Sequence, residues 1–100
     1  MIRGTTPKHT FNIPITADDV SAARVVYAQF GRDKIIKTGA DLALTGNQIE
    51  CVLTQEDTMS FSCKYPVEVQ VRILTTAGLV MASDIMTINV ERCLDSEVLA

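Results

Sequence analysis

Apolar and polar residues alternate most regularly between Pro66 and Val90. In the first arm of this stretch, β-branched residues occupy every second position, at Val67, Val69, Val71 and Ile73. A period of two places these side chains on one face of a strand and the intervening charged and amide groups on the other. A turn follows at residues 75–78, where Gly78 can adopt positive φ, and the even positions from Val80 to Val90 are again mostly apolar. The stretch is predicted to form one long antiparallel hairpin at the centre of the domain.

Shorter segments with the same period lie along the rest of the chain, separated by turn signals. The expected strands span residues 8–15, 23–30, 34–38, 42–45, 48–54, 66–76 and 79–91. Pro14 places the first strand at a sheet edge, because proline has no N–H to donate to a neighbouring strand. The second strand is apolar on both faces, which favours a central position.

This succession of short strands predicts an all-β fold, an immunoglobulin-like antiparallel β-sandwich of about seven strands. The chain contains no tryptophan, so the likeness to antibody domains is one of architecture only. A barrel of six or seven strands is the alternative. One hundred residues correspond to one domain, and we expect a single β-sandwich domain over residues 1–100 with short arms at residues 1–7 and 92–100.

One helical turn is expected between the fifth strand and the long central strand. Thr54 followed by Asp57 fits a capping box, with Asp in place of the usual Glu or Gln. Leu53, Met59 and Phe61 are then expected to point inward and to close one end of the core.

The charge balance and the absence of long apolar runs narrow the function classes. The net charge is −3, which disfavours nucleic-acid binding through a basic surface. No apolar stretch approaches the roughly 18 residues that span a bilayer, and the first residues do not resemble a secretory signal. The expected site of synthesis is a cytoplasm, with no membrane partner.

The residues that most often carry chemistry are few and scattered. His9 is the only histidine, and Cys51, Cys63 and Cys93 show no metal-ligand spacing, so the cysteines are interpreted as buried thiols. No strand register that the pattern supports brings His9 to a cysteine. Asp84 interrupts an apolar face, which predicts a bulge, an edge location or a hydrogen-bonded partner. No catalytic, cofactor-binding or metal-binding residue is assigned, and an enzyme is not expected.

Three segments resemble a known group of proteins. They are residues 3–11 (RGTTPKHTF), 53–61 (LTQEDTMSF) and 67–72 (VEVQVR), and together they resemble small proteins encoded in prophages of Gram-positive bacteria. The pattern is also similar to the immunoglobulin-like N-terminal domain of phage baseplate upper proteins, which continue beyond this domain into further segments. The resemblance implies a non-enzymatic component of a tail or baseplate region and supplies no catalytic residues.

Two functions remain in view besides the disfavoured enzyme. The first is a structural or assembly module. Its partners are further copies of the chain, as a possible homo-oligomer, or other phage structural proteins, and the contacts are made through exposed strand edges and the terminal arms. This function leaves open whether the protein is associated with the virion. The alternative is a β-sandwich that binds a small ligand or a carbohydrate. Carbohydrate sites usually display aromatic platforms, and the five aromatic residues mostly fall at expected core positions: Phe11, Tyr27, Phe30, Phe61 and Tyr65.

Overall fold

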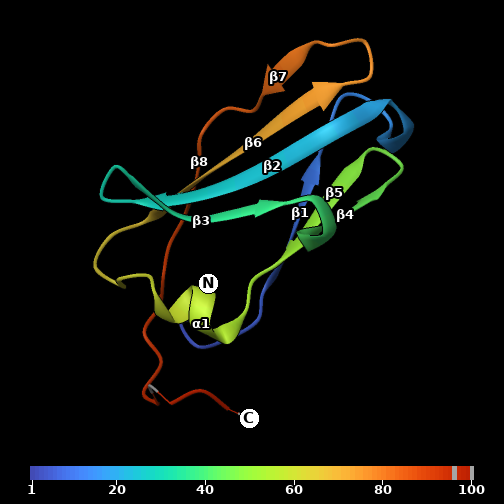
Figure 1. Ribbon diagram of the computed structural model, residues 1–100. Helices are drawn as coiled ribbons and strands as arrows, with labels where there is room; N and C mark the ends of the chain where they lie inside the picture. Colours follow the sequence, from blue (N-terminus) through green and yellow to red (C-terminus); the bar gives the residue numbers. More distant parts are fainter. Residues whose placement is uncertain (96, 100) are drawn as a thin grey trace.

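Two antiparallel sheets pack face to face in this protein (Figure 1). The computed structural model describes residues 1–95 and 97–99, except for the side chains of residues 32–34. The smaller sheet has the strand order β1 (Lys8–Asn12), β5 (Gln48–Val52), β4 (Leu42–Thr45). The larger sheet has the order β3 (Arg32–Thr38), β2 (Val20–Gln29), β6 (Val67–Thr75), with β7 (Val80–Ala82) and β8 (Met86–Ile88) both paired with β6. Three single helical turns connect strands: η1 (Ala17–Asp19), η2 (Gly39–Asp41) and α1 (Gln55–Met59).

The predicted all-β sandwich is confirmed, and so are the edge position of β1 and the central position of β2. Its strand order differs in one respect from the constant-type immunoglobulin domain, in which the second strand joins the sheet of the first, fourth and fifth. Here β2 instead lies between β3 and β6. The strand bounds also shift, because β1 ends at Asn12 and β2 already begins at Val20.

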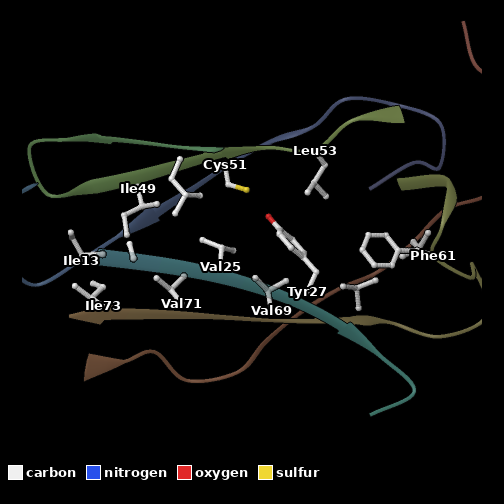
Figure 2. Packing of buried hydrophobic residues seen from close by; sticks show 14 residues of the cluster. Ile13, Val25, Tyr27, Ile49, Cys51, Leu53, Phe61, Val69, Val71 and Ile73 are labelled. Carbon is white, nitrogen blue, oxygen red and sulfur yellow. The ribbon is translucent and has the colours of Figure 1, made fainter. Parts of the chain in front are cut away.

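The core lies between the two sheets and follows from the predicted alternation (Figure 2). On β2 the odd positions from Ala23 to Gln29 are buried, with Val25 and Tyr27 fully so, and on β6 Val67 and Val69 are buried in the same way. The smaller sheet contributes Ile49 and Cys51 from β5. Leu53 and Phe61 close one end of the core as predicted, while Met59 is only half-buried.

The second arm of the long hairpin is two short strands rather than one. Between Ala82 and Met86 this edge advances by four residues while β6 advances by three, from Arg72 to Val69. One extra residue is therefore inserted at residues 83–85, which is a β-bulge. The sequence predicted that the even positions of this arm share one face, and this is wrong. Val80 lies opposite Leu74 on the outer face, whereas Met86 lies opposite Val69 on the inner face. Asp84 is exposed in the bulge at a sheet edge, which agrees with its predicted placement.

The N-terminal arm, which is expected to be irregular, is bonded to the body of the chain. The N-terminal ammonium of Met1 donates to the Asn89 carbonyl at 2.9 Å, and Ile2 forms a parallel bridge with Glu91. The buried Thr58 hydroxyl accepts from the Gly4 N–H at 2.9 Å and donates to the Thr5 carbonyl at 2.9 Å. The bonds with Thr58 anchor the arm to α1, and those of Met1 and Ile2 anchor it to residues 89–91.

The capping box predicted for α1 is present. The Thr54 hydroxyl accepts from the Asp57 N–H at 3.1 Å, and the Asp57 carboxylate accepts from the Thr54 N–H at 2.9 Å. Each side chain accepts a hydrogen bond from the backbone N–H of the other residue, and a single helical turn would leave both N–H groups without a partner.

The C-terminal arm extends past α1 with most of its surface in solvent (Figure 1). Leu94 is 91% exposed, and the described residues of the arm, 92–95 and 97–99, form no helix. Its one described anchor to the body is the Gln55 amide, which donates to the Leu99 carbonyl and accepts from the Leu99 N–H, both at 2.8 Å. Residues 96 and 100 of the predicted arm lie outside the described residues.

Candidate interaction site

An apolar groove of about 250 Å³ opens between the edge of the smaller sheet and the bulged edge of the larger one. One wall is β1 and the residues after it, the other wall is the β7–β8 edge, and the floor is β6. Its lining residues include Thr10, Phe11, Val71, Met81 and Met86. The groove exists because the sheets are open on this side, so that inward-facing side chains reach solvent there.

The free edge of β1 presents unpaired backbone groups to this groove. The Leu53 N–H donates to the Pro7 carbonyl at 3.0 Å, and the Ile13 N–H donates to the Asn47 carbonyl at 2.8 Å. Both bonds extend the β1–β5 register, so odd positions of β1 direct their N–H and C=O groups toward β5. Because this direction alternates along an antiparallel ladder, Lys8, Thr10 and Asn12 direct theirs outward. These groups form a template for an added strand.

The two methionines make the opposite wall adaptable. Met81 lies opposite Ile73 and Met86 lies opposite Val69 in the pairing with β6, so both side chains face the inner side of the larger sheet. Methionine is unbranched and polarizable, and it fits partners of irregular shape. The inner side of β1 adds the half-buried Phe11. The groove thus combines apolar, deformable walls with a row of backbone hydrogen-bonding groups.

A polar cluster lies in the core between β1, β5 and β2. His9 and Cys51 are direct cross-strand partners in the β1–β5 pairing, which overturns the expectation that no register brings His9 to a cysteine. Nδ1 of His9 lies 2.7 Å from the Tyr27 hydroxyl, and Figure 2 shows this hydroxyl pointing across the interior toward β5. Cys51 is fully buried.

The electrostatics of this cluster keep its groups neutral. Burial raises the pKa of the Cys51 thiol and outweighs the hydrogen bond with Tyr27, which lowers it. Burial also raises the pKa of the Tyr27 phenol and lowers that of His9. A nucleophilic cysteine requires a thiolate stabilised by a nearby positive charge, and Cys51 is instead a protonated thiol without access to solvent. The cluster therefore serves packing and hydrogen bonding between the sheets.

A charged pair lies between β3 and α1. Nζ of Lys37 lies 2.8 Å from Oδ2 of Asp57, and both side chains are largely buried. Burial raises the pKa of Asp57, but the salt bridge with Lys37 and the hydrogen bonds with Thr54 together lower it below its usual value. The pKa of Lys37 is raised, chiefly by the hydrogen bond with Asp57.

Several sequence-based assignments to the core are wrong. Cys63 and Cys93 are exposed thiols. Phe30 and Tyr65 are 57% and 53% exposed, and their rings contact edge to face with centroids 4.7 Å apart. Phe30 leaves the core because it forms the two-residue β2–β3 turn with Gly31, where φ is +59° and +71°; two positive φ angles indicate a type I′ turn.

The groove itself was not predicted from the sequence. Its signal is the break in alternation around Asp84, since the inward positions change from odd at Met81 to even at Met86. That change of parity indicates an inserted residue and hence an irregular sheet edge.

The described residues contain no helix with the length and apolarity needed to cross a membrane. Within residues 1–95 and 97–99, His, Cys, Asp and Glu side chains form no group of three or more suited to a metal ion. Comparison of the chain with protein-family models, curated proteins and solved structures gave no significant match.

Proposed function

We propose that the protein is a non-enzymatic assembly module that binds an extended segment of a partner protein along β1. The observation that carries this proposal is the outward row of backbone groups at Lys8, Thr10 and Asn12 beside the apolar groove. In this binding mode the main chain of the ligand continues the sheet, and alternate side chains of the ligand enter pockets.

The chemistry of the groove defines the partner. A strand added to β1 directs every second side chain toward Phe11, Met81 and Met86, so these positions of the partner are apolar. The opposite face of that strand meets solvent beside Thr10 and Asn12 and is polar. The partner segment is therefore extended and alternates apolar with polar residues.

The proposed setting is a phage or prophage particle, in its tail or baseplate region. Support for the setting comes from the three segments that resemble prophage proteins, at residues 3–11, 53–61 and 67–72. The partner is then another structural protein of the same particle. Synthesis in a bacterial cytoplasm and later association with the virion belong to the same proposal.

Strand addition is tested with overlapping synthetic peptides that cover the products of the genes flanking this one. In ¹⁵N-labelled protein, the bound peptide is expected to shift the amide signals of Thr10 and Asn12 and to slow their hydrogen exchange. A peptide that binds without protecting these two amides contradicts strand addition along β1. If none of the peptides binds, the assembly role is rejected.

A pair of variants separates backbone pairing from side-chain contact. Thr10→Pro removes one outward N–H and leaves the β1–β5 bonds in place, since proline is tolerated where the N–H faces away from the sheet. Thr10→Val changes the side chain and retains the N–H. Binding is expected to weaken about tenfold with Thr10→Pro, which corresponds to one lost hydrogen bond, and to persist with Thr10→Val.

A second candidate, carbohydrate binding, is favoured by the exposed aromatic pair Phe30 and Tyr65. Aromatic faces in solvent are the usual platforms for sugar rings, and Phe30 is held there by a positive-φ backbone that disfavours side chains. Titration with a glycan panel, monitored through the Tyr65 ring signals, tests it. Binding that Phe30→Ala abolishes supports this function, and no shift with any glycan removes it.

A further inference from the structure

The outer face of the larger sheet carries four cross-strand rows of side chains. Pairing places Ala22, Leu74 and Val80 in the first row and Thr38, Arg24, Arg72 and Ala82 in the second. The third row holds Ile36, Val26 and Gln70, and the fourth holds Ala28, Glu68 and Thr87. The outer face of a sandwich is usually polar, and this one mixes apolar residues, among them Leu74, Val80, Ile36 and Val26, with polar and charged ones.

Two like charges lie directly opposite each other in the second row. Arg24 and Arg72 are cross-strand partners, an arrangement that destabilises a sheet. Among the described residues, Arg24, Arg72 and Glu68 form no ion pair. Glu68 lies four residues from Arg72 along β6, about 13 Å away, so these charges do not meet within one chain.

The order of the rows is self-complementary. Consider two copies packed face to face and related by a two-fold axis that runs across the strands, along the row of Val26 and Gln70. In the second copy β2 and β6 lie over the same strands of the first copy but run in the opposite direction. The rotation places Arg72 of one copy over Glu68 of the other, and because the axis is two-fold it does so twice. Val26 and Ile36 then meet their own counterparts.

The overlap of the two copies is that of a weak dimer. The rotation about the row of Val26 lays residues 23–29 of β2 over those of the second copy, a length of about 23 Å, and four strands span about 15 Å. Each copy therefore covers about 350 Å² and the two together about 700 Å², the size of a weak, transient contact. Aligned packing of two sheets face to face is a standard arrangement.

We propose that this outer face is the interface of a two-fold symmetric dimer of the chain, with Arg72 paired to Glu68 of the second copy. The dimer leaves β1 and its groove free, so this inference does not depend on the proposed strand addition.

Sedimentation velocity over a concentration series tests the dimer. The wild type is expected to shift from monomer to dimer as its concentration rises. Arg72→Glu and Glu68→Arg each place like charges at both contacts and are expected to raise the dimer dissociation constant by about tenfold or more, since close charge pairs in interfaces are strongly coupled. Arg92→Glu, in the exposed C-terminal arm, makes the same charge change outside the face and is expected to leave the constant unchanged.

Mixing the two charge-reversed chains gives the decisive result. When R72E meets E68R, one contact joins the two introduced side chains, which have opposite charges, and the other joins the native Glu68 and Arg72. An equimolar mixture is therefore expected to form a heterodimer although neither chain dimerises alone. A wild type that stays monomeric to roughly 1 mM, or a mixture that stays monomeric, overturns the proposal.

A stability measurement excludes misfolding as the cause of lost dimerisation. The side chain introduced by R72E faces Arg24 within its own sheet and replaces a like-charge pair with an opposite-charge pair. At concentrations where the wild type is monomeric, the urea midpoint of R72E is therefore expected to rise.

Discussion

The hydroxyl of Tyr27 lies 2.7 Å from Nδ1 of His9, and this hydrogen bond joins the two sheets through the core. Tyr27 belongs to β2 of the larger sheet and His9 to β1 of the smaller one. Because burial raises the pKa of the phenol and lowers that of the imidazole, the bond joins a protonated phenol to a neutral imidazole, and the tautomer of His9 decides which group donates.

Tyr27→Phe is predicted to lower the free energy of unfolding by about 1–2 kcal/mol. The substitution preserves the ring packing and leaves the half-buried Nδ1 of His9 without its partner, and an unsatisfied polar atom lowers stability by about this amount. Urea denaturation of both chains measures the difference. Tyr65→Phe is the matched control, because Tyr65 is exposed, and it is expected to have little effect. Equal stability of Tyr27→Phe and wild type would show that the bond contributes nothing.

The stability of the protein is predicted to fall as the pH decreases through the range in which His9 titrates. Burial lowers the pKa of His9 below 6.5, so the unfolded chain binds its proton first. Stability is therefore fully present above pH 6.5 and decreases below that value, until the folded chain is protonated as well. Urea midpoints from about pH 7.5 to about pH 5.5 measure the slope. His9→Gln, which removes the only histidine, is expected to flatten the profile over this range.

Asp57→Ala is predicted to destabilise the protein by about 1–2 kcal/mol, because it removes half of the capping box and the partner of Lys37. The pKa of Asp57 is lowered below 3.8, so its contribution is present above that pH and is lost as the pH falls toward the folded-state pKa. Thermal unfolding at neutral and acidic pH checks both statements. Glu56→Ala, at the exposed neighbouring position, should leave stability nearly unchanged, and an equal loss in both variants contradicts a specific role for Asp57.

The three thiols are predicted to react at two distinct rates with a disulfide reagent. Cys63 and Cys93 are exposed, and Cys51 is buried, so two thiols react at once and the third reacts only as the chain unfolds. Mass spectrometry of the labelled protein counts them over time. In the Cys63→Ser, Cys93→Ser chain the labelling rate of Cys51 is expected to follow urea concentration as unfolding does. Rapid labelling of Cys51 in native buffer contradicts the burial of this thiol in the core.

Local alternation predicts the strands of this fold because each one has to bury a single face. The runs through Val67–Thr75 and Gln48–Val52 follow that rule, and the capping box at Thr54 follows from short-range hydrogen bonding in the same way. Which strands pair is a different matter, since it depends on contacts between distant residues. His9 and Cys51 are 42 positions apart in the sequence, and only the β1–β5 register brings them together.

The errors in the predicted core have two physical causes. Phe30 is apolar, yet the β2–β3 turn needs positive φ at two successive positions and therefore turns this side chain away from the core. At Asp84 the chain avoids burying a carboxylate by inserting a residue, which moves the inward positions by one. The groove and the charged outer face both depend on pairing across strands, so neither can be seen in any single segment of sequence.

The β-bulge at residues 83–85 affects how copies of this domain can pair through their sheet edges. A sheet edge that is continuous and straight recruits further edges, and copies joined in this way grow into fibres. On the larger sheet the bulge shortens the two flanking strands to three residues each, too few to hold a recruited strand. Growth by edge pairing is therefore disfavoured on that side of the larger sheet.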